Sequence, residues 1–263
     1  MSALLEIDGL GIAFGGIKAV DDVSFAVRAG EIVSVIGPNG AGKTTLFNMI
    51  SGLYRPSQGK VRLEGADITA MEPHLLARRG LSRTFQNLQV FGEMTLLENV
   101  MVGHHLREKA GVLSDLFGLP VSRRKTRASA ESALALLARV GLEKAAYRAA
   151  RTMSYGALKR LEIARALALD PKILLLDEPA AGCNAVETEE IDRLIAEIAR
   201  AGVAILLVEH DMKLVMKISA HLVVLDHGRK IAEGAPAQVA RDPQVIAAYL
   251  GQHGQEQVLH AEG

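Results

Sequence analysis

The chain of 263 residues has little cysteine and no excess of charge of either sign. A single cysteine, Cys183, excludes an internal disulfide framework and is typical of a reducing compartment. The 30 basic and 30 acidic residues cancel, which removes the electrostatic argument for a nucleic-acid partner. No apolar run approaches the roughly 18 residues of a membrane-spanning helix, and the start, MSALLEIDGL, does not have the pattern of a signal peptide. We therefore expect a cytosolic chain that reaches a membrane only through a partner.

The most informative segment that is present is GPNGAGKT at residues 37–44, which fits G-x-x-x-x-G-K-[ST]. An apolar strand, EIVSVI, is predicted before it and a helix, TTLFNMI, after it. In such a loop, backbone N–H groups surround a β-phosphate, Lys43 reaches the β and γ oxygens, and Thr44 offers a hydroxyl to Mg²⁺. The alternative is a chance glycine-rich turn. Because both flanks and every fixed position match, the segment predicts nucleotide binding.

Two further apolar strands end in polar residues. ILLLDE at 173–178 delivers Asp177 to the carboxyl edge of a sheet, where it can hold Mg²⁺ directly or through water, and places Glu178 to polarise an attacking water. VAILLVEHD at 203–211 places His210 where it can contact a γ-phosphate. Taken alone, the first strand could end in a solvated acidic turn and His210 could be an ordinary loop residue. The upstream phosphate loop favours the catalytic interpretation.

Two other segments carry weaker signals. Gln86 follows the predicted strand LSRTF and could offer an amide oxygen to Mg²⁺ or to a water. MSYGALKRLEIARAL at 153–167 predicts a helix with Ser154 at its N-cap, whose hydroxyl and free N–H groups could bind an anion. Plain N-capping is the commoner role of such a serine.

The pattern of elements predicts an α/β fold. Short strands at 5–8, 23–27 and 61–63 suggest a small antiparallel sheet beside a parallel one. Strands and helices then alternate from residue 173 onward, which is typical of a parallel sheet covered on both faces. Residues 95–142 are predicted to be helical, with a looser stretch at 108–127 whose RRKTR run we interpret as a solvated face or loop.

In their order along the chain, GPNGAGKTT, Gln86, SYG…RLEIARAL, ILLLDEP and His210 resemble the nucleotide-binding subunit of ABC transporters, over residues 4–251. The segments RTFQNLQVFGEMTLLENVMVGHH, EPAAGCNAVETEE and IAEGAPAQVARDPQVIAAYLG, together with the insertion, resemble the larger ATPase of branched-chain amino-acid importers. The resemblance implies a P-loop NTPase core with a mainly parallel sheet, a small antiparallel β-subdomain and an inserted α-helical subdomain. It divides the ABC ATPase domain, 1–251, into an ATP-binding core with the β-subdomain (1–86 and 160–251) and a helical subdomain (87–159, with the insertion 108–127), followed by a flexible tail (252–263).

The resemblance also implies ATP and Mg²⁺ as cofactors and gives roles to residues. Glu178 is the general base, His210 is the γ-phosphate switch, and Gln86 contacts the metal and the attacking water. The metal shell consists of Thr44, Gln86 and Asp177. Ser154 and Gly156 bind the γ-phosphate of the nucleotide held by another subunit. Phe14 matches the aromatic residue that stacks on adenine, unless it is a core or loop residue. The remaining nucleotide-binding residues are Gly37, Pro38, Asn39, Gly40, Ala41, Gly42, Lys43, Thr44 and Thr45.

The function that follows from the resemblance is ATP hydrolysis that powers uptake of branched-chain amino acids or related small solutes. The implied partners are membrane permeases, a second ATPase subunit (a paralogue or an identical copy) and, indirectly, a solute-binding protein, but no nucleic acid. The implied location is cytoplasmic, peripheral on the inner face of the cell membrane through the permeases. Alternatives are the ATPase of an envelope-lipid (lipopolysaccharide-type) exporter, a soluble ABC ATPase without a permease, and a small-molecule kinase.

The chain departs from the family's pattern at three positions. Ala157 and Leu158 replace residues that are usually polar, and Cys183 stands where leucine is usual, which we interpret as packing. Val90, Phe91 and Met94 are expected either to dock on a membrane partner or to pack in the core. The effect of Ala157 and Leu158, the identity of the solute and the identity of the second subunit do not follow from the sequence.

Overall fold

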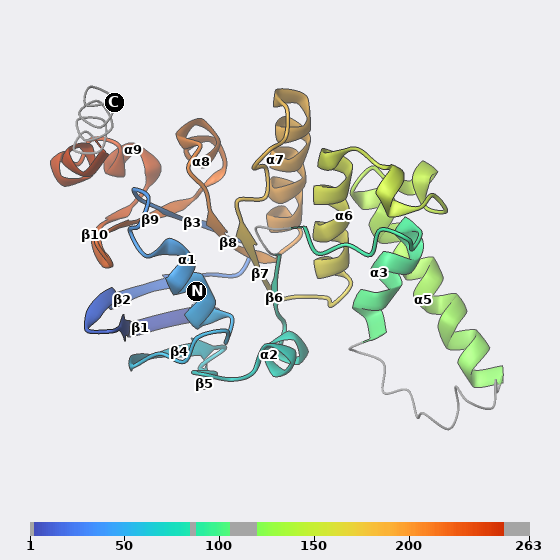
Figure 1. Cartoon of the computed structure of the whole chain (residues 1–263), viewed down its shortest axis with the longest axis horizontal. Helices are drawn as coiled ribbons and strands as arrows, with labels where there is room; N and C mark the ends of the chain where they lie inside the picture. Colours follow the sequence, from blue (N-terminus) through green and yellow to red (C-terminus); the bar gives the residue numbers. More distant parts are fainter. Residues whose placement is uncertain (1–2, 85–87, 106–119, 250–263) are drawn as a thin grey trace.

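The computed structural model describes residues 3–84, 88–105 and 120–249, which form two sheets and a set of helices beside them (Figure 1). In this part of the chain, one sheet has four strands in the order β2-β1-β4-β5 and the other has six in the order β10-β9-β3-β8-β7-β6. The strands are β1 (Leu5–Phe14), β2 (Ile17–Val27), β3 (Ile32–Ile36), β4 (Gln58–Leu63), β5 (Ala66–Asp67), β6 (Leu81–Arg83), β7 (Ile173–Asp177), β8 (Ala204–Val208), β9 (His221–Asp226) and β10 (Arg229–Gly234). The helices are α1 (Lys43–Ile50), α2 (Pro73–Arg79), α3 (Leu96–His105), α5 (Pro120–Arg139), α6 (Tyr155–Leu167), α7 (Ala185–Arg200), α8 (Met212–Ile218) and α9 (Pro236–Val239), with single 3₁₀ turns at Glu143–Ala145 and Ala150–Thr152.

The six-stranded sheet is parallel except at one edge. Strands β9, β3, β8, β7 and β6 run in the same direction, whereas β10 pairs antiparallel with β9. Every residue of β3, β7 and β8 is buried, because helices cover both faces of the sheet. Asp177 and Val35 both pair with Val208. The carboxyl ends of these three strands therefore lie in register at one edge of the sheet.

A group of helices, α3, α5 and α6, lies beside this core and away from the small antiparallel sheet (Figure 1). Leu96, Val100, Leu137 and Leu161 of these helices belong to an apolar cluster that extends to one face of the parallel sheet. The side chain of Asn99 is fully buried, accepts a hydrogen bond from the backbone N–H of Phe91 (2.9 Å) and donates one to its carbonyl (3.0 Å). Asn99 thereby fixes the segment that precedes α3.

The predicted fold class is confirmed: a parallel core, a small antiparallel sheet and an inserted helical region are all present. The helix with apolar residues at i, i+3, i+4 and i+7 is α7, and its four predicted core residues, Ile191, Leu194, Ile195 and Ile198, are buried. Cys183 packs against the apolar cluster on the helical side, which agrees with a packing role.

The prediction of a looser stretch at 108–127 was wrong for its second part. Helix α5 begins at Pro120, because proline is well tolerated in the first turn of a helix and no breaker follows it before Arg139. Residues 108–119 lie outside the described part of the chain. Strand β10 and helix α9 were not predicted. Among the described residues, no helix is both long and apolar enough to cross a bilayer.

Candidate functional site

The loops that follow β3, β7 and β8 meet at one edge of the parallel sheet, where open α/β folds bind ligands. Gly37 follows β3, Glu178 follows β7, and Glu209 and His210 follow β8. The backbone N–H of Glu178 donates to the carbonyl of Val208 (2.9 Å), which joins two of these loops. Three predicted site segments that are far apart in the sequence are thus brought together.

A cavity of about 640 Å³ surrounds the start of α1. Its walls come from the phosphate loop, from the beginning of β2, from Glu178 and from the turn between β9 and β10. The lining residues are Ile17, Lys18, Ala19, Asn39, Gly40, Ala41, Gly42, Lys43, Thr44, Thr45, Glu178, His227 and Gly228. Seven of the nine predicted residues of the loop, Asn39 to Thr45, therefore face one space that is large enough for a nucleotide's phosphates. Sequence reasoning missed the β2 and β9–β10 contributions, because they depend on how the two sheets are joined.

The two sheets are joined next to this cavity. Arg229 donates two hydrogen bonds to Asp21 Oδ2, at 3.0 and 2.7 Å, and the backbone N–H of Asp21 donates to the carbonyl of Gly228 (2.8 Å). The N–H of Gly228 in turn donates to the carbonyl of Ala41 (3.1 Å). These contacts hold the β2 wall and the β9–β10 turn against the phosphate loop.

Two glycines of the loop have no room for a side chain. A Cβ at Gly37 would lie 2.1 Å from the carbonyl oxygen of Leu225, and one at Gly42 would lie 2.5 Å from that of Ala19. Both glycines also have positive φ, at 150° and 99°. Because only glycine combines this conformation with such close backbone approach, these two positions fix the path of the loop around the cavity.

The ammonium group of Lys43 is folded against the loop itself. It donates to the carbonyl oxygens of Gly37 (2.6 Å) and Pro38 (2.9 Å), and only 9% of the residue is exposed. Burial lowers the pKa of Lys43, while the nearby carboxylates of Glu178 and Asp177 oppose that shift. The cation is therefore held at the floor of the cavity, beside the helix N-terminus that would face a phosphate.

Asp177 is buried and paired with a buried arginine. Arg83 Nη2 lies 2.9 Å from Asp177 Oδ2, and Arg83 Nη1 donates to Asn48 Oδ1 and to Ser51 Oγ, both at 2.7 Å. Burial raises the pKa of Asp177, and Arg83 partly offsets this. Asp177 is a buried carboxylate at the edge of the parallel sheet, and a carboxylate is the type of oxygen donor that Mg²⁺ prefers. Sequence reasoning identified Asp177 but missed Arg83.

Glu178 and His210 form the second pair. His210 Nδ1 lies 3.5 Å from Glu178 Oε1, and the backbone of Glu178 has a positive φ of 49°, which is strained for a residue with a side chain. Such strain is found where a side chain must be aimed at a particular place, and here Glu178 is aimed into the cavity. His210 is exposed, with 64% of its side chain accessible.

Beneath this pair lies a buried carboxyl group that was not predicted. Glu209 is 3% exposed; its Oε2 accepts the backbone N–H of His210 (3.2 Å), and its Oε1 has no hydrogen-bond partner among the described residues. Burial raises the pKa of Glu209. An acidic residue directly before His210 was the available signal, but its burial was not readable from the sequence.

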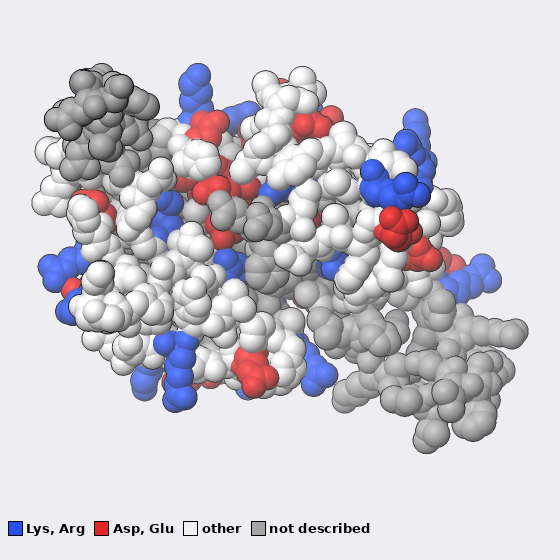
Figure 2. All heavy atoms as spheres, viewed as in Figure 1, with Lys and Arg blue, Asp and Glu red and all other residues white. Residues whose placement is uncertain are grey.

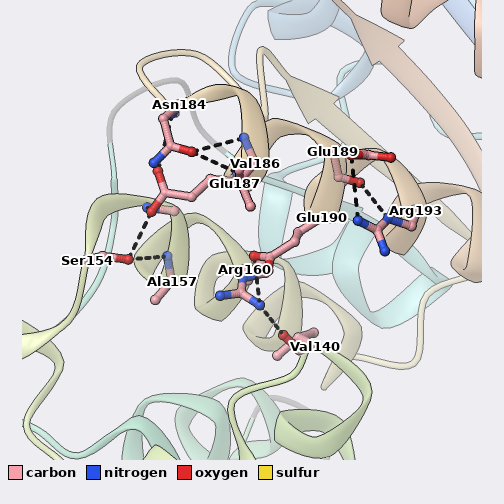
Figure 3. A network of polar contacts seen from close by, with 11 residues as sticks. Val140, Ser154, Ala157, Arg160, Asn184, Val186, Glu187, Glu189, Glu190 and Arg193 are labelled. Carbon is pink, nitrogen blue, oxygen red and sulfur yellow. Dashed lines mark hydrogen bonds and ion pairs between the residues drawn. The ribbon is translucent and has the colours of Figure 1, made fainter.

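The segment of Ser154 and Gly156 lies elsewhere in the molecule, at the start of α6. Ser154 is the N-cap, as predicted, and its Oγ accepts the backbone N–H of Ala157 (3.3 Å). Neither residue lines the cavity around the phosphate loop. They face Glu187 on α7 instead (Figure 3).

Gly37, Pro38, Asp177 and His210 are also not among the lining residues of the cavity, and neither is Phe14. Phe14 at the end of β1 is 47% exposed and packs edge-on against Tyr54, with ring centroids 5.5 Å apart, so it is a surface aromatic residue and not a core residue. It pairs across the hairpin with Ile17, which does line the cavity. Gln86 lies outside the described residues.

The charges on the visible face do not form a basic groove. In Figure 2, basic and acidic side chains of the described residues are interspersed, and acidic groups gather near the centre of the view. This distribution does not match the clustered Lys and Arg of a nucleic-acid-binding face.

Comparison with known proteins identifies the family. The family model described as ABC transporter matches residues 20–181, and the model described as branched-chain amino acid ATP-binding cassette transporter matches residues 229–254. The chain is 47% identical over 250 residues to the high-affinity branched-chain amino acid transport ATP-binding protein BraF of Pseudomonas aeruginosa, covering 95% of this chain and 98% of that protein. It is 46% identical to the corresponding protein LivG of Escherichia coli K12, with the same coverage.

A solved structure and a more distant relative complete the comparison. The crystal structure of an ATP-binding cassette of an ABC transporter in its ADP conformation superimposes with a TM-score of 0.82 at 34% identity, over 95% of this chain and 100% of that one. The lipopolysaccharide export system ATP-binding protein LptB of Haemophilus influenzae is 35% identical over 250 residues, covering 95% of this chain and 98% of that protein. The phosphate loop, the carboxylates at the edge of the parallel sheet and these matches lead to one conclusion: the chain is an ATP-binding, ATP-hydrolysing member of the ABC transporter family.

Proposed function

We propose that this chain powers an importer of branched-chain amino acids or related small solutes. The observation that supports this best is the match of the C-terminal segment 229–254 to the branched-chain amino acid model, in a chain 47% identical to BraF along 95% of its length. The identity to the lipopolysaccharide export protein is lower, at 35% over the same coverage. The importer is therefore the better-supported function.

The nucleotide site would be completed by a second subunit. The cavity around the phosphate loop is lined by the loop, β2, Glu178 and the β9–β10 turn, whereas Ser154 and Gly156 stand at the start of α6 and line no part of it. A nucleotide that contacts both sets of residues must lie between two chains. ATP would then join the two subunits, because its γ-phosphate carries charge that donors from both chains satisfy, and hydrolysis would release them.

Mg²⁺ would bind through oxygen ligands at the edge of the parallel sheet. Thr44, which lines the cavity, and Asp177, a buried carboxylate, would provide oxygen ligands, and Gln86 is the third proposed contact. When bound, the metal neutralises charge that develops on the β and γ phosphates. Lys43 provides the protein's own cation at the same place, and the α1 N-terminus adds its dipole.

Glu178 would be the general base. Its carboxylate faces the cavity, 3.5 Å from His210 Nδ1, so it can accept a proton from a water while His210 contacts the γ-phosphate. Phe14 would stack on the adenine from the rim, next to Ile17. The protein thereby contributes position and electrostatics to phosphoryl transfer, without a covalent intermediate.

The helical subdomain would dock on membrane permeases. Phe91 and Met94 are 46% and 40% exposed and so would be available for docking, whereas Val90 is half-buried and packs against the core. Asn99 fixes the segment from behind. The chain would be cytoplasmic and peripheral on the inner face of the membrane, with a second ATPase subunit beside it and a solute-binding protein across the membrane.

Uptake in a reconstituted system tests the proposed solute. The chain is combined with the permeases and solute-binding protein of a branched-chain amino acid importer, and the uptake of radiolabelled leucine, isoleucine, valine and a control sugar into vesicles is measured. We expect ATP-dependent uptake of the branched amino acids that stops with Glu178→Gln. Sugar uptake alone, or export of lipopolysaccharide without amino-acid uptake, would contradict the proposal.

A further inference from the structure

The donors that the family resemblance assigns to a nucleotide are already engaged by a carboxylate of this chain. Glu187 Oε1 accepts a hydrogen bond from Ser154 Oγ (3.0 Å), as the close view of α6 and α7 shows (Figure 3). It also accepts one from the backbone N–H of Gly156 (3.3 Å). Its other oxygen, Oε2, accepts the backbone N–H of Asn184 (3.3 Å). One side chain thus connects the start of α7 with the start of α6.

The fit between the two helices leaves no spare room. A Cβ at Gly156 would lie 2.4 Å from Cδ and 2.7 Å from Oε1 of Glu187, so only glycine allows the carboxylate to lie against this backbone. Hydrogen bonds from Asn184, Ser154 and Gly156 hold the pKa of Glu187 below its ordinary value. The group is therefore an anion at neutral pH, at the positive end of a 13-residue helix.

We propose that Glu187 is an internal competitor of the second subunit's nucleotide for Ser154 and Gly156, and that it sets the ATP concentration at which the two chains close. This inference rests on the proposed two-chain site. A γ-phosphate and the Glu187 carboxylate cannot share the same donors, both because the space is filled and because like charges repel. Closure therefore requires the carboxylate to leave Ser154 and Gly156.

The Glu187 side chain can keep its hydrogen bond to Asn184 after it leaves Ser154 and Gly156. Asn184 Oδ1 accepts the N–H of Glu187 (3.0 Å), and Glu187 Oε2 accepts the N–H of Asn184, which together form a capping box at the start of α7. This cap does not depend on Ser154 or Gly156. The structure of α7 can therefore persist while the carboxylate releases α6, and the two roles of Glu187 can be separated by mutation.

The variant Glu187→Gln separates them. Glutamine at this position still completes a capping box, so α7 keeps its start, but the anion that accepts from Ser154 and Gly156 is lost. A neutral acceptor binds more weakly to these donors than a charged one does. The ATP concentration that gives half-maximal pairing should therefore fall about five- to tenfold.

The measurement is made in a Glu178→Gln background, in which bound ATP is not consumed. ATP is titrated with Mg²⁺ present, and the fraction of paired chains is followed by light scattering. The matched control is Glu189→Gln, on the same helix, whose exposed carboxylate pairs with Arg193 one turn on (3.8 Å). It removes the same charge without touching α6, and we expect its ATP requirement to equal that of the parent.

A second variant, Glu187→Asp, and amide exchange at Gly156 test whether the effect comes from the contact between Glu187 and α6. Glu187→Asp keeps the charge but shortens the side chain, so its carboxylate should reach Ser154 and Gly156 less well. Because the competition is then weaker, this variant should also lower the ATP requirement for pairing. Without ATP, the amide N–H of Gly156 should exchange with solvent faster in both variants than in the parent.

The results distinguish a failure of the proposed competition by Glu187 from a failure of the proposed two-chain site. If Glu187→Gln needs as much ATP as the parent, or more, Glu187 does not compete and the inference is wrong. If the parent pairs with ATP neither with itself nor with the second ATPase subunit, the proposed two-chain function itself fails. A lower ATP requirement in Glu187→Gln and Glu187→Asp, with Glu189→Gln unchanged, supports the inference.

Discussion

At the scale of single residues, three carboxylates that are buried or hydrogen-bonded belong to the proposed sites. They differ in how the surrounding residues stabilise their charge. Asp177 is compensated by Arg83, Glu187 is stabilised by three hydrogen-bond donors, and Glu209 is buried with one oxygen unpartnered in the described structure. Because an unpaired buried carboxylate is costly when ionised, Glu209 is the group whose protonation should affect stability most visibly.

Replacing Glu209 should therefore change how stability depends on pH. Burial raises the pKa of Glu209 in the folded protein above the ordinary value of 4.5. Its contribution is then fully present below pH 4.5 and is lost as the pH rises through the folded-state pKa, because the unfolded chain releases the proton first. In Glu209→Gln this loss is absent, so the difference in unfolding free energy between the variant and the wild type should shift in favour of the variant as the pH rises.

Urea denaturation at a series of pH values from about 4 upward measures this difference. The control is Glu143→Gln, an exposed carboxylate in the 3₁₀ turn before α6. A difference between Glu209→Gln and the wild type that stays constant over the whole series would show that Glu209 has an ordinary pKa.

Residues within a local motif were predictable, whereas their partners were not. GPNGAGKT, ILLLDE and the N-cap Ser154 are readable because the motif and the element it forms lie in one stretch of sequence. Arg83 and Glu187 contact Asp177 and Ser154 across 94 and 33 residues of chain. Such pairs depend on strand order and helix packing, for which the sequence carries no local signal.

At the scale of elements, Arg83 connects three of them. It lies at the end of β6, pairs with Asp177 at the end of β7, and donates to Asn48 and Ser51 at the end of α1. Arg83 and Asp177 have side chains that are only 7% and 3% exposed. Removing one partner of such a pair leaves an uncompensated buried charge.

Arg83→Met should destabilise the fold by about 3–5 kcal/mol, as expected when a buried ion pair loses one member. The double variant Arg83→Met with Asp177→Asn should recover a substantial part of this loss, since the charge that was left unpaired is then also removed. Urea denaturation of the four combinations measures both effects. The control is Arg127→Met, whose exposed pair with Glu131 on α5 should contribute less than about 1 kcal/mol. Equal losses in Arg83→Met and Arg127→Met would contradict the coupling between these elements.

Elements were predictable where their apolar pattern was strong and unpredictable where it was weak. The buried strands β3, β7 and β8 and the amphipathic helix α7 were expected near their observed bounds. Strand β10 was missed because its residues are mostly half-buried at the edge of the sheet, so RKIAEG has no clear alternation. The start of helix α5 was predicted too far along the chain, because its first turns are rich in charged and small residues.

At the scale of the whole molecule, the account depends on a nucleotide shared by two chains. Glu178 is the residue that we assign to activation of the attacking water, while the ATP contacts come from other residues. Glu178→Gln should therefore abolish turnover, retain ATP binding and leave the two chains joined. Light scattering with ATP and Mg²⁺ should give twice the mass of the single chain.

The same variant combined with Ser154→Ala provides the matched control. The double variant keeps the phosphate loop but loses the Ser154 hydroxyl, which would bind the nucleotide held by the other chain. It should therefore still bind ATP but should pair much less. A Glu178→Gln variant that stays monomeric while saturated with ATP, or that turns over at the wild-type rate, would show that Glu178 has another role.

The most direct test of the shared site is the dependence of ATPase activity on the concentration of the chain itself. If each site needs donors from two polypeptides, the activity per chain must fall as the protein is diluted, and the rate should scale with the square of the concentration while monomers dominate. We predict this fall over the range in which sizing shows dissociation. Activity per chain that stays constant among chains shown to be monomeric would contradict the account.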